Sequence, residues 1–150
     1  MSRPDPDDPV APYVALLEGL SPARLDALKA ILAPEVRFSD PFNDVTGPER
    51  VVAVFDDMFR RLPDLTFTVT DRCTSRQTDG GHRAYLCWTL RGRARPGGRT
   101  WRFAGVSELQ FDPAGRLILH RDHWDAAGQL YEKLPLLGPI LRALRRRLAG

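Results

Sequence analysis

Residues 65–124 read LTFTVTDRCTSRQTDGGHRAYLCWTLRGRARPGGRTWRFAGVSELQFDPAGRLILHRDHW and carry the strongest structural signal in the chain. Segments rich in β-branched and aromatic residues, a composition typical of strands, lie within it at 65–76, 83–95, 100–111 and 116–124. Short segments rich in Gly, Pro and Asp, which favour tight turns, separate them at 79–81, 96–98 and 112–115. We therefore predict an antiparallel meander.

Helical patterns precede the meander, at 13–20, 22–32 and 47–62. Ser21 and Pro22 suit the N-terminus of the second helix, and Pro34 should follow its end. Between the second and third helices we predict a short strand at 36–39 and a turn at 40–44, because Asx side chains bond neighbouring backbone and Pro fixes φ. Helices followed by a meander indicate an α+β domain whose helices cover one face of the sheet.

The last 25 residues, 126–150, have a helical pattern that Pro135 and Gly138-Pro139 interrupt. One face of the predicted helix carries Leu137, Ile140, Leu141, Leu144 and Leu148, and another carries Arg142, Arg145 and Arg146. This is the pattern of a basic amphipathic helix. Two readings stay open: the helix docks on its own domain or on a dimer partner, or it binds a membrane surface.

The length of 150 residues and the apolar content of 43% suit one domain with one core. We expect a disordered leader at 1–10, a folded domain at 11–126 and a helical extension of that domain at 127–150. No stretch approaches the roughly 20 apolar residues that cross a bilayer, and the acidic, proline-rich start is unlike a signal peptide, so we predict a cytoplasmic protein. Cys73 and Cys87 lack metal-ligand spacing and are predicted to be reduced thiols buried in strands.

The net charge of +3 is unevenly distributed along the chain. Residues 1–81 carry nine basic and fourteen acidic side chains, and residues 82–150 carry thirteen basic and five acidic ones. Apart from the run at 145–147, the basic residues are dispersed over predicted strands and match no nucleic-acid-binding motif. We therefore expect no nucleic-acid partner.

Several short strings, taken in order, carry a resemblance to a known superfamily. They are Tyr13-Val14-Ala15, Arg37-Phe38-Ser39-Asp40-Pro41 leading into Gly47, Leu109-Gln110-Phe111 followed by Ala114-Gly115, and His120-Arg121-Asp122-His123-Trp124-Asp125. From about Tyr13 to Ala126 the chain resembles the nuclear transport factor 2-like superfamily, which includes ketosteroid isomerases, limonene epoxide hydrolases and SnoaL-type polyketide cyclases. The resemblance implies a SnoaL-like α+β fold, with a cone-shaped, curved antiparallel sheet wrapped by N-terminal helices, a cavity, and a homodimer formed through the outer sheet face.

Strand alternation predicts which side chains line that cavity. On the strand at 100–111, one face carries Trp101, Phe103, Gly105, Ser107, Leu109 and Phe111, and we take it as the inner face. On the last strand, alternation alone leaves both faces possible, and the resemblance to ketosteroid isomerases places His120, Asp122 and Trp124 inward. The predicted ligand-binding residues are Phe55, Phe59, Trp88, Trp101, Phe103, Ser107 and Trp124, which suit a hydrophobic, ring-containing small molecule.

Asp40 falls where ketosteroid isomerases keep the carboxylate that moves a proton next to a carbonyl. A carboxylate facing an apolar cavity loses hydration, which would make Asp40 usable as a general base. The alternative is an aspartate that bonds backbone N–H groups in the turn around Pro41.

Tyr13 matches the helical tyrosine that donates a hydrogen bond to the oxyanion in the same enzymes. The second donor in that family is a carboxylic acid, and the corresponding residue here is Ser107, a weaker acid. The alternative for Tyr13 is an ordinary packed tyrosine.

His120 and Asp122 lie two apart on one strand and could form a polar pair that faces Asp40. The string around them resembles the strand end of limonene epoxide hydrolases, where an aspartate helps to deprotonate the attacking water. The arginine and aspartate that those enzymes use on the preceding strand are replaced here by residues 105–108, Gly-Val-Ser-Glu. A buried hydrogen-bond network that fixes the strand is the alternative. His120 and His123 fall on opposite faces and His82 lies beside a turn, so we expect no metal site. The predicted chemistry needs no cofactor.

Two functions follow from these residues. One is a cofactor-free isomerase, cyclase or hydrolase that binds a hydrophobic small molecule and transfers protons through Asp40, His120 and Asp122. The other is a non-catalytic ligand-binding or assembly domain that uses the cone as a scaffold and the C-terminal helix to contact a partner or an anionic membrane. Convergence of the polar side chains on an open cavity would favour the first.

Overall fold

A computed structural model describes residues 8–149 of the chain. Three helices lie before the long strands, α1 (Val10–Glu18), α2 (Leu25–Ala30) and α3 (Pro48–Arg61), with a 3₁₀ turn η1 (Pro22–Arg24) before α2. The strands are β1 (Leu32–Ser39), β2 (Asp44–Thr46), β3 (Thr66–Arg76), β4 (His82–Arg93), β5 (Thr100–Phe111) and β6 (Leu117–His123). The chain continues through α4 (Ala126–Gln129) and η2 (Tyr131–Lys133) to α5 (Leu137–Leu148).

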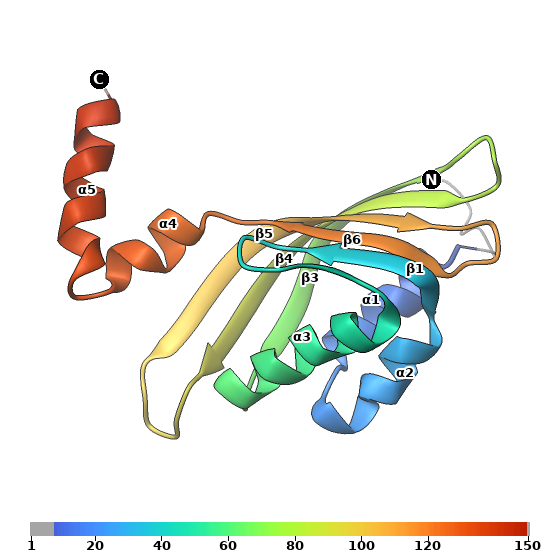
Figure 1. The fold of residues 1–150 in the computed structure, drawn as a ribbon, viewed down its shortest axis with the longest axis horizontal. Helices are drawn as coiled ribbons and strands as arrows, with labels where there is room; N and C mark the ends of the chain where they lie inside the picture. The colour runs from blue at the N-terminus through green and yellow to red at the C-terminus, as the bar shows by residue number, and fades with distance from the viewer. Residues whose placement is uncertain (1–7, 150) are drawn as a thin grey trace.

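The six strands form one curved sheet in the order β2-β1-β6-β5-β4-β3, with α1, α2 and α3 on one of its faces (Figure 1). The meander predicted from residue 65 onward is present as β3 to β6, and its strands pair antiparallel. β1 pairs with β6 in parallel, because the whole meander separates these two strands and no hairpin constrains their direction. The fold is therefore the predicted α+β arrangement, with one parallel pair inside an otherwise antiparallel sheet.

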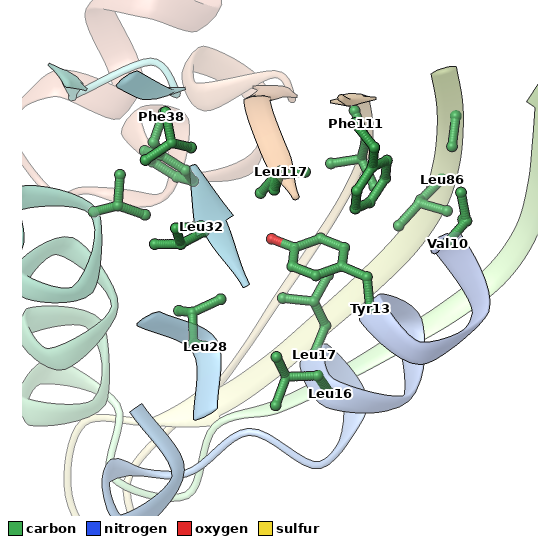
Figure 2. Close-up of a cluster of buried hydrophobic side chains, with 14 of the residues drawn as sticks. Val10, Tyr13, Leu16, Leu17, Leu28, Leu32, Phe38, Leu86, Phe111 and Leu117 are labelled. Atoms are coloured by element: carbon green, nitrogen blue, oxygen red, sulfur yellow. The ribbon is translucent and has the colours of Figure 1, made fainter. Parts of the chain in front are cut away.

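The core fills the space between the helices and the sheet (Figure 2). Tyr13 and Leu28 reach it from the helices, and Leu86, Leu109 and Leu117 reach it from the strands, all of them almost inaccessible to solvent. Each buried aliphatic side chain of this kind contributes about 1.5–3 kcal/mol to the free energy of folding.

The start of the sheet differs from the sequence-based expectation. The helix predicted at 22–32 ends at Ala30, and Leu32 already belongs to β1. Pro34 lies where the register between β1 and β6 shifts, a position that tolerates the missing N–H of proline. The sequence predicts a turn at 40–44 and no strand at β2. Three residues are too few to show alternation, and only pairing with β1 makes them a strand.

Cys73 and Cys87 are free and exposed, so the prediction of buried thiols is wrong for both. They lie in β3 and β4 as expected, but on side-chain positions that face away from the helices. Seven residues of the predicted leader, 1–7, lie outside the described part of the chain, and Val10 is already a buried residue of α1.

The C-terminal extension leaves the cone after β6 (Figure 1). Pro135 separates η2 from α5 as predicted, whereas Gly138 and Pro139 lie in the first turn of α5 and do not interrupt it. Proline is tolerated there because the first N–H groups of a helix have no intrahelical acceptor. Among the described residues, no helix is long and apolar enough to cross a membrane.

Candidate functional site

A cavity of about 1010 Å³ lies between α3 and the inner face of the sheet. Its wall includes all six aromatic residues that the sequence placed in the ligand-binding set: Phe55, Phe59, Trp88, Trp101, Phe103 and Trp124. Asp40, His120 and Asp122 also contribute to the wall. Tyr13 and Ser107 do not reach it.

Gly105 gives two of these aromatic residues their space. A Cβ at position 105 would lie 2.6 Å from the Trp88 ring and 2.9 Å from the Cβ of Trp124, distances that real side chains do not adopt. Trp124 packs edge-on against Phe103, with ring centroids 5.2 Å apart. Because Gly105 has no side chain, Trp88 and Trp124 can pack directly on the backbone of β5 and form part of the cavity wall.

The register of β6 brings His120 and Asp122 to the inner face. His120 pairs with Leu109 and Asp122 pairs with Ser107 across the β5–β6 ladder. On its other side His120 lies opposite Phe38 of β1. The His120 side chain is consequently buried, with 2% of its surface exposed, beside Tyr13 and Phe55.

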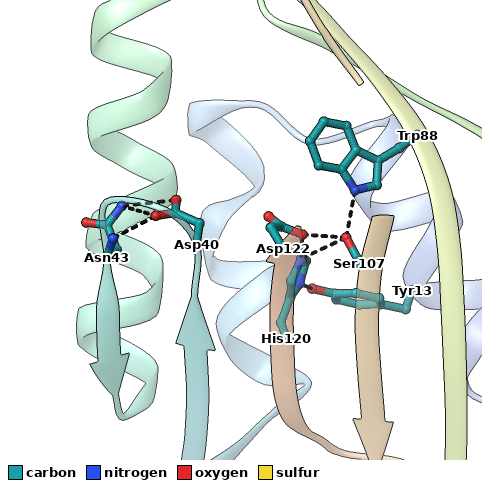
Figure 3. Close-up of polar contacts among 7 residues, drawn as sticks. All are labelled: Tyr13, Asp40, Asn43, Trp88, Ser107, His120 and Asp122. Carbon is teal, nitrogen blue, oxygen red and sulfur yellow. Dashed lines mark hydrogen bonds and ion pairs between the residues drawn. The ribbon is translucent and has the colours of Figure 1, made fainter. Parts of the chain in front are cut away.

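A chain of hydrogen bonds converges on one oxygen of Asp122 (Figure 3). The Tyr13 hydroxyl lies 2.7 Å from Nδ1 of His120, and Nε2 of His120 lies 2.8 Å from Oδ1 of Asp122. From the opposite side, Trp88 Nε1 donates to Ser107 Oγ at 2.9 Å, and Ser107 Oγ donates to the same Oδ1.

The donor directions follow from the charge of Asp122. A carboxylate oxygen only accepts, so the bond to Asp122 assigns a proton to Nε2 of His120, and in that tautomer Nδ1 accepts from the Tyr13 hydroxyl. Burial, and secondarily the negative charge of Asp122, raise the pKa of the Tyr13 hydroxyl well above its usual range, which keeps Tyr13 protonated as the donor. Every proton in the chain therefore points toward Asp122.

The second oxygen of Asp122, Oδ2, accepts no hydrogen bond from any described residue, and the side chain remains 18% exposed at the cavity wall. Two donors hold Oδ1 and fix the orientation of the carboxylate. The arrangement presents one oriented carboxylate oxygen that can accept a proton from a molecule in the cavity.

Asp40 lies next to Asp122 at the end of β1, since Ser39 pairs with Arg121 in the parallel ladder. Its Oδ1 accepts the backbone N–H groups of Phe42 and Asn43, both at 2.7 Å, and the Asn43 side-chain amide donates to both carboxylate oxygens. The sequence left two readings of Asp40, and these contacts are those of the turn-bonding aspartate (Figure 3).

Tyr13 and Ser107 are predicted from the sequence to contact a bound molecule, but their hydroxyl groups bind other side chains of the protein. The Tyr13 side chain is 2% exposed, and its hydroxyl is bound to His120. The hydroxyl of Ser107 donates to Asp122 and accepts from Nε1 of Trp88. Both side chains orient the carboxylate instead of facing the cavity.

Polar residues of α3 that sequence reasoning missed also line the cavity, namely Arg50, Asp57 and Arg61. Arg61 Nε donates to Asp57 Oδ2 at 2.7 Å. Their spacing of seven and four residues places them on one helix face with Val54, and this periodicity was the signal available in the sequence. Within residues 8–149, no group of three or more His, Cys, Asp or Glu side chains is arranged to hold a metal ion.

Solved structures with the same fold come from several bacteria. A proposed SnoaL-like polyketide cyclase from Jannaschia sp. CCS1 superposes with a TM-score of 0.68 at 18% identity, over 85% of this chain and 94% of that one. AclR, a proposed hydroxylase from Streptomyces galilaeus, superposes with a TM-score of 0.63 at 20% identity, over 94% of this chain and 89% of that one. RV0760c from Mycobacterium tuberculosis, solved in complex with estradiol-17beta-hemisuccinate, superposes with a TM-score of 0.63 at 21% identity, over 79% of this chain and 95% of that one. At these identities the likeness establishes the fold alone.

A search among curated proteins finds no significant match. The family model of the SnoaL-like domain matches residues 13–120, which run from the tyrosine of α1 to the histidine of β6. With the cone-shaped fold, this match shows that the chain belongs to the SnoaL-like domain family.

Proposed function

We propose that the protein binds an apolar, ring-containing small molecule in its cavity and that Asp122 takes a proton from it without a cofactor. The observation that carries this proposal is the free Oδ2 of Asp122 at the cavity wall, oriented by two hydrogen bonds to Oδ1. Asp122 replaces Asp40 as the proposed base, because the carboxylate of Asp40 is already bound by Phe42 and Asn43.

The class of reaction follows from the Asp122 carboxylate and the two donors that hold it. A proton leaves a carbon or an oxygen of the bound molecule and moves to Oδ2, and the electron pair stays on the molecule. Asp122, then neutral, still accepts from His120 and Ser107 at Oδ1 and can return the proton to a second position. Such a sequence isomerises or cyclises a molecule that carries a carbonyl group, with proton balance preserved.

The aromatic side chains in the cavity wall favour an apolar, ring-containing ligand. Trp101 and Phe103 stack with their ring planes 4° apart, and Trp124 meets Phe103 edge-on, so ring-shaped apolar surfaces face the cavity. The similar structures named above include a proposed polyketide cyclase and a protein bound to a steroid derivative, both of which involve ring systems. The shape and chemistry of the cavity fit molecules of that kind.

Tryptophan fluorescence tests the binding step. All three tryptophans of the chain, Trp88, Trp101 and Trp124, lie in the cavity wall, so their emission reports on this site alone. Titration with estradiol-17beta-hemisuccinate should quench the emission to saturation. Phe103→Ala should weaken binding at least about tenfold by removing buried aromatic contact.

The matched control is Tyr85→Ala, which removes an exposed aromatic side chain from the outer face of the sheet. It should bind like the unaltered protein. Failure to saturate, or equal losses in both variants, would contradict binding in this cavity. Saturable binding together with no proton transfer from any bound ketone would instead support the non-catalytic alternative.

A further inference from the structure

The C-terminal helix α5 carries an apolar stripe that is mostly exposed, with only Leu141 half-buried. The stripe consists of Leu137, Ile140, Leu141, Leu144 and Leu148, which follow one another at helical spacing. Exposed fractions are 66% for Ile140, 52% for Leu144 and 78% for Leu148. Figure 1 shows α5 projecting away from the cone, so the helices and sheet of the cone do not cover the stripe.

The polar side of α5 is purely cationic. It carries Arg142, Arg145, Arg146 and Arg147 and no acidic residue. At 100° per residue, Arg145 and Arg147 lie at the two borders of the stripe, and Arg142 and Arg146 lie opposite it. Arg146 and Arg147 make no ion pair or side-chain hydrogen bond with any of residues 8–149.

Several contacts fix α5 on its connecting segment, residues 126–136. Arg142 donates to the backbone oxygen of Glu132, and Arg145 forms an ion pair with the Glu132 carboxylate at 3.0 Å. Gly138 packs so closely on the Glu132 backbone that a side chain there would clash. The amide of Gln129 exchanges two hydrogen bonds with the backbone of Ala104 in β5, at 2.7 and 2.9 Å. These contacts hold the stripe away from the cone.

We propose that α5 binds the surface of a membrane that contains anionic lipids. The stripe would enter the boundary between headgroups and acyl chains, and the arginines at its borders would reach the lipid phosphates. A short helix with an apolar stripe and an all-cationic polar face has the composition of an interfacial helix. Each arginine near an anionic surface strengthens binding by about fivefold.

A second copy of the chain fits this surface less well. The helix of 12 residues is about 18 Å long and about 10 Å across, far less area than the roughly 800 Å² that each partner buries in a stable protein interface. Packing of the stripe on the stripe of another copy would also bring the border arginines, Arg145 and Arg147, of the two helices near one another. A nucleic acid would pair with the arginines but would leave the apolar stripe exposed to water.

The connecting segment also reaches the cavity, because Leu130 belongs to its wall and Tyr131 packs on Phe42 near Trp124. A protein bound through α5 would hold its cavity beside the bilayer, where apolar molecules dissolve. That consequence rests on the proposed function, whereas vesicle binding by α5 does not.

Co-sedimentation with vesicles tests the proposal. The 150-residue protein should bind vesicles of phosphatidylcholine mixed with phosphatidylglycerol, bind pure phosphatidylcholine vesicles much more weakly, and lose affinity as salt is raised. The double variant Ile140→Ser/Leu144→Ser should lose most of the binding. Its control, Ala143→Ser, makes the same kind of change off the stripe and should bind normally.

Charge is tested in the same assay. Arg147→Glu, at a border of the stripe, should weaken binding to the mixed vesicles at least about fivefold. Arg95→Glu, an identical charge change in the loop between β4 and β5, should weaken it less. The melting temperature of Ile140→Ser/Leu144→Ser should equal that of the unaltered protein, since both side chains are exposed.

Three results would overturn the proposal. The first is undiminished binding of Ile140→Ser/Leu144→Ser to the mixed vesicles, and the second is equal binding to vesicles with and without phosphatidylglycerol. The third is failure of the unaltered protein to bind the mixed vesicles. If Ile140→Ser/Leu144→Ser then also lowers the melting temperature or dissociates a dimer, the stripe is covered by protein instead. Steroid quenching of tryptophan fluorescence is measured on the same variants and should not change, which separates this proposal from the proposed function.

Discussion

His120 is a buried histidine whose two ring nitrogens both have partners, and this decides what Asp122 can do. With Tyr13 on Nδ1 and Asp122 on Nε2, the ring has no free nitrogen for a bound molecule. His120 is therefore a positioning residue, and the free carboxylate oxygen beside it is the group that can react. The aspartate and the histidine, which the sequence treated as a pair, have different roles.

Tyr13→Phe tests this network. It removes the donor to the buried Nδ1 of His120, and an unpaired buried acceptor costs about 1–3 kcal/mol of unfolding free energy. Burial raises the pKa of Tyr13 in the folded state, so the unfolded chain ionises first as pH rises. The stability that the neutral hydroxyl supplies is therefore fully present below about pH 10, the ordinary pKa of tyrosine, and is lost as pH rises further. Urea unfolding at increasing pH should show the two proteins converging above that pH. A difference independent of pH would contradict the assigned donor.

Asp40→Asn tests the role of the turn. The carboxylate accepts N–H groups from Phe42 and Asn43, and hydrogen bonds to a charged acceptor are stronger than those to an amide. We expect the substitution to lower the unfolding free energy by about 1–2 kcal/mol. Denaturant unfolding at neutral pH measures this, and higher stability of the variant would instead identify Asp40 as a poorly solvated charge.

Among the elements, the long strands and the α3 helix could be predicted because each repeats one pattern over ten or more residues. The orientation of β6 could not be obtained from alternation, since both of its faces mix apolar and polar residues; the resemblance was needed to place His120 inward. β2 depends on how one turn folds back on β1, which no local pattern encodes. The turn bonds of Asp40 are local and were one of the two readings that the sequence left open, and only the structure shows that they form. The directions of the Trp88 and Ser107 hydrogen bonds depend on side chains from two neighbouring strands, so they too required the structure.

The core strand β6 and the C-terminal helix α5 should respond differently to one kind of substitution. Leu117→Ala removes a fully buried side chain of β6 and should cost about 2–5 kcal/mol of unfolding free energy. Leu144→Ala removes an exposed side chain of α5 and should change it by less than about 0.5 kcal/mol. Urea denaturation of both variants checks the contrast. A comparable loss for Leu144→Ala would mean that α5 packs on the cone in solution.

For the whole molecule, we propose a homodimer formed through the outer face of the sheet. Tyr85 and Val106 are exposed there on β4 and β5, with the free Cys87 paired opposite Val106. A twofold contact would cover this apolar area. Sedimentation velocity should show a dimer that Val106→Arg dissociates, and a monomer alone at micromolar concentration would exclude this assembly.

The most direct measurement of the proposed chemistry is deuterium exchange from D₂O into the carbon next to the carbonyl of a bound ring ketone, followed by NMR. The unaltered protein should promote exchange. Asp122→Asn should reduce the rate by at least about 100-fold while tryptophan quenching shows that the ketone still binds, and Asp40→Asn should retain most of the rate. Exchange that survives Asp122→Asn, or that is lost in Asp40→Asn with folding and binding intact, would contradict the assignment of Asp122 as the base.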